Sequence, residues 1–161
     1  MSGTSKLQSI EDEMYDLIRG INAEPYNYVW GTVNERDMAK QEWPSAVIYF
    51  ENETNLDDKN GAWSQSYYEE VTYRIEVRAR LYSEYSNPVQ EIHKDLYKCL
   101  DDLKRLFGNK WNLNGECDTI MYMGSEIVEE PAGDIFIPSK LVSRWLVRYE
   151  HDRLDPEITV Q

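Results

Sequence analysis

The sequence predicts an α+β domain in which a mostly antiparallel sheet of about five strands packs against two main helices, in the order α-β-β-β-α-β-β. Two segments show the helical spacing of apolar residues, and the strand patterns between and after them come in runs of three and two. Successive strands without intervening helices are typical of antiparallel pairing. The chain has 161 residues and 41% hydrophobic residues, so we expect a single domain with its core over about residues 5–150 and a polar tail over 151–161.

The first element is a helix predicted over residues 5–20. Ser5 with Gln8 forms a potential capping box, Ser9 is an alternative start, and Gly20 falls where helices commonly end. Its apolar residues recur at helical spacing: Leu7, Ile10, Met14, Leu17, Ile18 and Ile21.

Two strands should follow Pro25. Alternating aromatic residues predict the first over 26–33. A polar segment then ends in Trp43-Pro44, and residues 45–51 are apolar on both faces, which is typical of a well-covered central strand. Residues 52–64 have the composition of a polar loop.

The third strand signal is unusually long. Residues 67–82, YYEEVTYRIEVRARLY, alternate almost without interruption. At about 3.3 Å per residue this stretch would reach ~50 Å, whereas common strands span ~17–20 Å. The sequence therefore predicts one long extended strand or hairpin, with length available for pairing outside the subunit. The alternative is a strand that a bend interrupts, or that is shorter than its pattern.

The second half begins with the most regular helix pattern, predicted over residues 88–107. Asn87 caps it, Pro88 takes the first helical position and Gly108 ends it. Strands are expected over 118–123 and 125–129, with a bulge at Gly124 between them. A connection over 129–139 leads to a last strand over 141–149.

The charge and cysteine content exclude several classes of protein. Lys and Arg total 17 and Asp and Glu total 30, a net charge of −13, which opposes binding to nucleic acid or to an anionic membrane. No apolar run approaches the ~20 residues of a membrane helix. The start, MSGTSKLQSIEDEM, lacks the features of a signal peptide, so synthesis in the cytosol is expected. Cys99 and Cys117 are expected to be reduced and packed.

Catalytic and ligand-binding motifs are not evident, so we expect no enzyme activity, no cofactor and no metal site. His93 and His151 have polar neighbours and are expected at the surface without a catalytic partner. The eight glycines form no phosphate-binding pattern. The pairs Asp57-Asp58 and Glu129-Glu130 are better explained as solvated acidic turns than as cation ligands.

Candidate contact residues come from the long strand and from two loops. Basic residues alternate with Glu70 and Glu76 along one side of the strand, which indicates either cross-strand ion pairs or a subunit interface. Three apolar residues also lie in the loop around Phe136, where a solvated loop would be polar. The full set of candidate interface residues is Trp63, Tyr67, Tyr68, Arg74, Arg78, Arg80, Ile135, Phe136 and Ile137.

In its layout, the chain resembles the tail terminator, or tail completion, proteins of long-tailed bacteriophages. An N-terminal helix leads into strands, and Trp43-Pro44 precedes an apolar strand at 46–50. A long strand with Tyr and Arg residues is followed by a capped helix at 87–107, and the last strand, 141–149, ends in an aromatic residue. The similarity covers about residues 5–150 and transfers no catalytic residue.

The resemblance implies a structural virion protein at the head-proximal end of the tail, assembled in the host cytoplasm. Such subunits form a ring, usually a hexamer, that caps the tail tube, stops its polymerisation and offers the surface for head joining. The implied partners are further copies of the chain, the tail tube protein and neck or connector proteins, with DNA passing through the lumen without specific binding. A subunit that stays monomeric until it meets the tail is an open alternative.

Three other functions remain open from the sequence. A neck or head-completion protein would have a similar fold and acidity. A small-ligand-binding or enzymatic α+β domain would need a pocket with convergent polar groups, for instance one lined by Trp30, Trp43 or Trp145 with His93. An adaptor that binds a basic partner through its acidic surface is the third.

Overall fold

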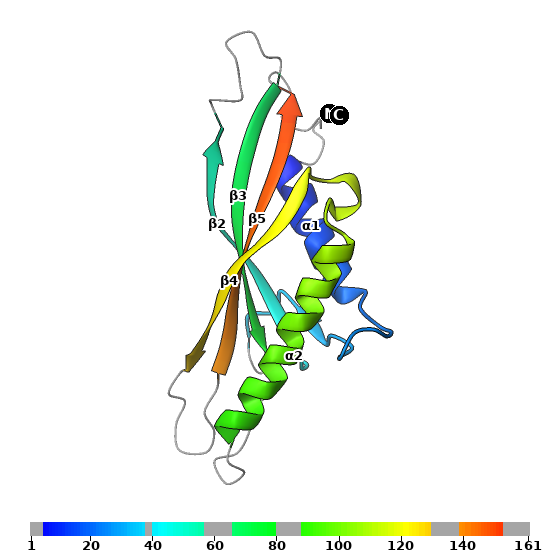
Figure 1. Ribbon diagram of the computed structural model, residues 1–161, viewed down its shortest axis with the longest axis vertical. Coiled ribbons are helices and arrows are strands. Elements are labelled where there is room, and N and C mark those ends of the chain that lie inside the picture. The colour runs from blue at the N-terminus through cyan, green and yellow to red at the C-terminus, as the bar shows by residue number, and fades with distance from the viewer. Residues whose placement is uncertain (1–4, 38–39, 57–65, 80–87, 130–138, 153–161) are drawn as a thin grey trace.

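A five-stranded mixed sheet, with two helices packed on one of its faces, forms the architecture of the computed structural model (Figure 1). The strand order is β1-β2-β3-β5-β4, and every neighbouring pair is antiparallel except β1 and β2. The predicted α+β class and the order of the elements are therefore confirmed. The structure describes residues 5–37, 40–56, 66–79, 88–129 and 139–152.

Helix α1 (Lys6–Arg19) forms as its sequence predicts. The Ser5 hydroxyl accepts the Gln8 backbone N–H at 3.2 Å, and the Gly20 N–H donates to the Asp16 carbonyl at 2.9 Å, so both ends are capped. Its buried side, which includes Ile10 and Met14, packs in the core against the sheet. The cap at Ser5 selects this start over the alternative at Ser9.

The strand predicted over 26–33 is wrong for most of its length, because β1 is only Thr32–Val33. The preceding residues bind α2 (Pro88–Asn109) instead of another strand. The backbone N–H groups of Asn27 and Tyr28 both donate to the buried carboxylate of Asp102, at 2.7 and 3.1 Å. Backbone donors that a helix side chain satisfies are no longer available to a sheet, so the alternating aromatic residues here do not mark a strand.

The three central strands are all long, which corrects the interpretation of the overlong strand. They are β2 (Ser45–Asn55), β3 (Ser66–Arg78) and β5 (Ser139–Asp152). β3 pairs with β2 from Glu69 to Arg78 and with β5 from Ser66 to Val77. Over residues 69–77 both edges of β3 are thus occupied inside the subunit, and residues 80–82 of the predicted strand lie outside the described residues. The predicted strands that end at residues 51 and 149 were both too short, because β2 continues to Asn55 and β5 to Asp152.

The strands on either side of β3 and β5, which are β2 and β4, each contain a bulge. In β2 the register shifts between Phe50 and Asn52, so Glu51 is the bulged residue and has no residue of β3 directly opposite it. In β4 (Thr119–Glu129) it shifts between Tyr122 and Gly124, and Gly124 has a φ of +128° that favours glycine. The bulge predicted at Gly124 is confirmed, and the two segments around it form one continuous strand.

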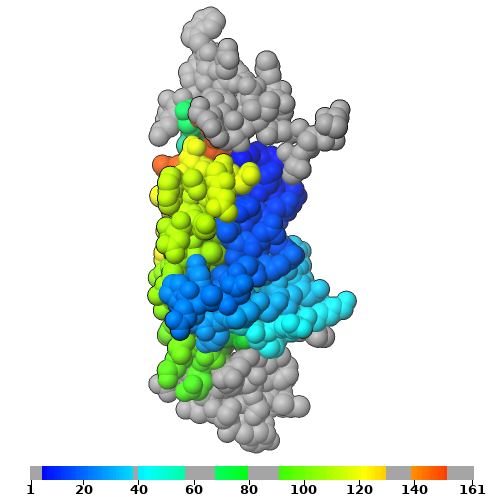
Figure 2. Space-filling model, turned by 90° about the vertical axis from the view of Figure 1, so that its right-hand side faces the viewer, coloured from blue at the N-terminus to red at the C-terminus, as the bar shows by residue number. Residues whose placement is uncertain are grey.

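Helix α2 lies along the same face of the sheet as α1 (Figures 1 and 2). The described residues of its apolar stripe are buried: Ile92, Leu96, Leu100, Leu103 and Phe107. The helix continues past Gly108 to Asn109, so the predicted end was too early. The Trp145 ring contacts Phe107 of α2 and Tyr122 of β4, with centroids 4.9 and 5.2 Å away. The core between the helices and the sheet includes Ile10, Met14, Ile18, Tyr73, Ile75, Ile92, Leu96, Leu103, Phe107, Leu141 and Trp145.

Candidate assembly surface

The sheet face opposite α1 and α2, here called the outer face, carries the even-numbered residues of β3 and β5. Odd-numbered residues such as Ile75 and Val147 are buried beneath the helices, whereas the even-numbered charged residues are only half-buried. Of the described helices, both lie on the other face (Figure 1). The basic residues of the outer face on these strands are Arg74, Arg78, Lys140, Arg144 and Arg148.

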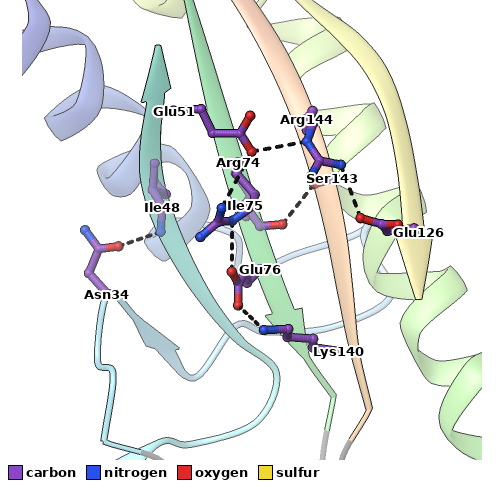
Figure 3. Close-up of polar contacts among 10 residues, drawn as sticks. All are labelled: Asn34, Ile48, Glu51, Arg74, Ile75, Glu76, Glu126, Lys140, Ser143 and Arg144. Carbon is purple, nitrogen blue, oxygen red and sulfur yellow. Dashed lines mark hydrogen bonds and ion pairs between the residues drawn. The ribbon is translucent and has the colours of Figure 1, made fainter. Parts of the chain in front are cut away.

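A chain of ion pairs crosses the outer face from β5 to β4 (Figure 3). Lys140 Nζ lies 2.9 Å from a Glu76 oxygen, and Arg74 Nε lies 2.9 Å from the other oxygen of the same carboxylate. The Arg74 Nε–H is not aligned for a hydrogen bond there, so the contact is an ion pair.

The second half of this series of ion pairs depends on the bulge in β2. The carboxylate of Glu51, the bulged residue, lies 3.7 Å from Arg74 Nη1 and 3.1 Å from Arg144 Nε. The other end of the Arg144 guanidinium reaches Glu126 of β4 at 3.4 Å. Arg74 and Arg144 are register partners on adjacent strands, so a carboxylate between them offsets the repulsion of two like charges. The bulge places that carboxylate.

Further contacts order the same face. Arg148 pairs with Glu70 at 3.0 Å. The guanidinium groups of Arg36 and Arg74 both lie over the ring of Tyr49, 4.7 and 4.5 Å from its centroid. Such a face can be exposed to solvent in the isolated subunit, because long charged side chains cover the apolar side chains between them, including Val47 and Val142.

Charge is unevenly divided between the outer face and the rest of the molecule. The five basic residues of the outer face are matched by five acidic ones. The formal charges of these ten residues cancel, so they contribute nothing to the net charge of −13 that the whole sequence carries. The acidic members of the outer face are Glu51, Glu70, Glu76, Glu126 and Glu150.

Carboxylates lie close enough to affect one another near the start of β4 and on α1. The Glu150 carboxylate raises the pKa of Tyr68 by its negative charge and by accepting a hydrogen bond from the Tyr68 hydroxyl. Burial raises the pKa of Asp118, and the nearby Glu150 adds to the effect. Burial also raises the pKa of Glu11, again with help from an adjacent carboxylate, Asp12. Carboxylates that hinder each other's ionisation indicate a locally negative potential.

The structure brings together three of the predicted interface residues. Tyr68, Arg74 and Arg78 lie on β3 in positions that face outward, and Tyr67 belongs to the same strand. The remaining predicted residues, Trp63, Arg80, Ile135, Phe136 and Ile137, lie outside the described residues. Of the two interpretations of the basic stripe, cross-strand ion pairing is confirmed for Arg74.

Sequence reasoning missed the residues of the other strands that complete this surface. The pattern of β5 contained a usable signal, since Arg144 and Arg148 alternate in phase with each other and out of phase with buried Trp145 and Val147. No sequence pattern identifies Glu51, because its position depends on a bulge in β2 and the strand predicted from the sequence already ends at this residue.

A second group of titratable side chains lies between α1 and the ends of β2, β3 and β5. The Tyr149 hydroxyl donates to Glu53 at 2.6 Å and to Glu69 at 3.1 Å, and His151 Nε2 lies 3.2 Å from Glu69. Burial and the Glu69 charge raise the pKa of Tyr149, so it remains a donor. The hollow beside these groups has a volume of about 190 Å³, below the ~300–1,000 Å³ of common ligand sites.

The histidines and cysteines occupy structural positions. His151 belongs to β5, not to a polar tail, and His93 has a partner, the Glu129 carboxylate at 3.1 Å, which sequence reasoning did not identify. Cys99 and Cys117 are free and buried, as predicted, and burial raises the pKa of Cys117 to about 12. Among the described residues, no group of three or more His, Cys, Asp or Glu side chains could hold a metal ion.

Two of the three expected tryptophans of a possible ligand pocket are core residues. Trp30 and Trp145 are buried in the hydrophobic cluster that joins the helices to the sheet. His93 instead lies on α2 beside Tyr97, with ring centroids 6.2 Å apart. A pocket of the kind that would favour a ligand-binding or enzymatic function is therefore not formed by these two tryptophans and His93.

Comparison with known proteins adds no family. The sequence matches no protein-family model, and no curated protein matches it. In the part of the chain that the structure describes, no helix is both long and apolar enough to cross a membrane. The geometry and charge of the surfaces are therefore the basis for assigning a function.

Proposed function

We propose that this protein is a tail terminator of a long-tailed bacteriophage: a structural subunit whose ring, a hexamer, caps the tail tube at its head-proximal end. The ring stops polymerisation of the tube, offers the surface for head joining and lets DNA pass without specific binding. A neck or head-completion connector is the close alternative, because the same subunit properties would serve it.

One observation carries the proposal: within the described residues both α-helices lie on one face of the sheet, and the other face is a broad surface of ordered ion pairs that extends over four strands. A monomeric enzyme would use such an area for a cleft with convergent polar groups. An assembly subunit needs wide surfaces that remain soluble before they meet a neighbour. The element order α-β-β-β-α-β-β and the net charge of −13 agree with the ring subunits that the sequence resembles.

The test combines assembly with capping. The mass of the 19.0 kDa chain is measured by light scattering after gel filtration, and the particles are imaged by electron microscopy. Tail tube protein from the same virus is then polymerised with and without the chain. We expect sixfold rings, free or on tube ends, and shorter tubes as the chain is added. An unrelated protein of similar acidity is the control and should leave tube length unchanged.

Unaltered tube length, together with no particle on the tube ends, would refute the terminator function. Rings that bind the head connector but leave tube length unaltered would move the assignment to the neck alternative. A small-ligand function would require saturable binding at the hollow beside Tyr149, or at the hollow of about 410 Å³ lined by Glu91, His93, Lys94 and Tyr97, measurable as a change in ligand affinity in a Tyr149→Phe or a His93→Ala variant.

A further inference from the structure

The outer edge of β4 is open over most of its length. β4 is the last strand of the sheet and pairs with β5 alone, so alternate backbone N–H and C=O groups point away from the sheet. At its start the chain closes this edge itself, because the Ile120 N–H donates to the Trp111 carbonyl at 2.8 Å. Among the described residues, the outward backbone groups of residues 122–129 have no hydrogen-bond partner.

This open part of β4 lacks most of the protection that edge strands usually have. Edges are commonly blunted by lysine, proline, a bulge or charge. Residues 122–129, YMGSEIVE, have the bulge but contain neither lysine nor proline. Their two carboxylates are held by the subunit itself: Glu126 contacts Arg144 at 3.4 Å, and Glu129 contacts His93 at 3.1 Å. Such an edge is a template for a further strand.

Helix α2 presents an exposed aromatic ring beside this edge. His93 and Lys104 both contact β4, through Glu129 and through the Tyr122 ring. Positions 93, 97 and 104 recur at helical spacing, so Tyr97 lies on the same side of the helix. Tyr97 is 55% exposed, and its ring lies 6.2 Å from that of His93. The hollow of about 410 Å³ that both rings line is therefore next to the open edge.

Residues 157–161, EITVQ, have the sequence pattern of an added strand. They lie outside the described residues. Ile158, Thr159 and Val160 are β-branched, a residue type typical of strands, and a period of two places the first and the last of them on one face. Pro156 precedes them, and proline cannot donate to a strand ladder, so the pattern predicts a strand separate from β5.

The chain is too short to place this segment on its own β4. Asp152, the last residue of β5, lies eight residues beyond Arg144, which is opposite Gly124 in the middle of β4. At ~3.3 Å per residue this separation is about 26 Å, without the additional width of β4. Ile158 comes six residues after Asp152 and reaches at most about 20–22 Å from it. A segment of this kind on the open edge must therefore come from another copy.

We propose that residues 157–161 of one copy add to the open edge of β4 in the next copy, with Ile158 and Val160 facing the hollow beside Tyr97. This inference rests on the proposed ring and names the contact that builds it. One segment of each copy binds a different surface of the next, and head-to-tail contacts of this kind close into a ring when the rotation fits. Copies that each carry a net charge of −13 repel one another, and backbone hydrogen bonds supply an attraction that needs no opposite charge.

The first experiment changes the segment and compares a matched control. Ile158→Ser/Val160→Ser removes the two apolar side chains, whereas Leu154→Ser/Thr159→Ser alters two neighbouring positions that the contact does not use. Mass is measured by light scattering over a range of protein concentration, with and without tail tube protein, and circular dichroism establishes that both variants fold. We expect the first variant to dissociate at a concentration at least about tenfold higher than wild type. The control should match wild type.

The second experiment identifies which copy supplies the segment. A chain with Lys94→Cys and Ile158→Cys is treated with a bismaleimide, and the products are separated under denaturing conditions. Cys99 and Cys117 are buried, so the reagent joins the introduced thiols. We expect a ladder of linked copies up to the mass of the closed ring. A chain with Asn22→Cys, at an exposed position after α1, and Ile158→Cys is the control and should stay at the monomer mass.

The outcomes separate this inference from the proposed function. Rings that are indifferent to Ile158→Ser/Val160→Ser would overturn the contact and leave the terminator function in place. Links formed only within single chains would overturn the assignment to a neighbouring copy. A chain that is monomeric both alone and with tube protein would overturn the contact, while the tube-capping assay still decides the function. Linked rings that leave tube length unaltered would support the contact and refute the terminator function.

Discussion

The carboxylate of Asp102 should be among the most important single side chains for stability, because it joins α2 to the segment before β1. It is fully buried and accepts three hydrogen bonds, from the Asn27 backbone N–H at 2.7 Å, the Asn27 side-chain amide at 3.1 Å and the Tyr28 backbone N–H at 3.1 Å. An Asp102→Ala substitution removes all three and leaves two backbone donors without their acceptor.

The magnitude follows from the competing terms. A hydrogen bond to a charged group contributes about 1.5–3 kcal/mol net. The three bonds are not additive, and the removal of a buried charge returns part of the desolvation cost. Asn27 is exposed, so water can reach its N–H groups after the substitution. We therefore expect the free energy of unfolding to fall by about 2–4 kcal/mol for Asp102→Ala, and by less for Asp102→Asn, which keeps one acceptor oxygen.

The adjacent residue provides the control. Asp101 lies on the same helix and has the same charge, but it is exposed. Asp101→Ala should change the free energy of unfolding by no more than about 0.5 kcal/mol. Equilibrium unfolding in urea, followed by circular dichroism at fixed protein concentration, gives both values. Equal stabilities of the two variants would refute the argument that Asp102 holds the segment before β1.

Two further predictions concern glycine positions and alkaline pH. Gly31→Ala should lower the free energy of unfolding, because the added Cβ would lie 2.5 Å from the Glu42 carbonyl oxygen. Gly108→Ala should raise it by about 0.5–1 kcal/mol, because the added Cβ on helix α2 would meet no neighbouring atom within 4 Å. Thermal unfolding of both variants measures these changes, and a Gly31→Ala variant as stable as wild type would contradict the first. Burial raises the pKa of Cys117 to about 12, so the folded state holds this proton more tightly than the unfolded chain. Stability should be unaffected by this group below about pH 9 and should fall from there towards pH 12, with a smaller slope in Cys117→Ala; urea unfolding across this pH range measures the slope, and equal slopes would contradict the prediction.

The parts of the fold that local physics determines could be predicted from the sequence. Helix α1 follows from its apolar period and its Ser5 cap, and the bulge in β4 follows from Gly124, which tolerates a positive φ. The segment at 26–31 could not be predicted in this way. Its alternating aromatic residues resemble a strand, but Asp102, more than 70 positions later, accepts its backbone donors. Contacts so distant along the chain leave no local pattern.

The candidate surface was predictable to a similar degree. Alternation identified the outward-facing side of β3 and hence Arg74 and Arg78. It did not identify which strand lies next to β3, and the register with β5 is what brings Arg144 beside Arg74. The same reason applies to the length of β3: over residues 69–77 its two edges are occupied by β2 and β5, and no pattern within β3 itself identifies those neighbours.

The paired bulges have a consequence for how this sheet tolerates changes in chain length. A one-residue deletion inside a strand normally moves every later side chain to the opposite face. In β2 the bulged residue Glu51 already shifts the alternation by one residue. Phe50 lies on the helix side of the sheet, against Tyr73, and Glu53, three positions later, lies on the same side, where it contacts Tyr149. Met123 does the same in β4. Deletion at the bulge is therefore the exception to this rule: loss of Glu51 would leave Asn52 opposite Thr72 and Glu53 opposite Val71, in the unbroken alternation of a regular strand, and Glu53 would stay on the side of Tyr149.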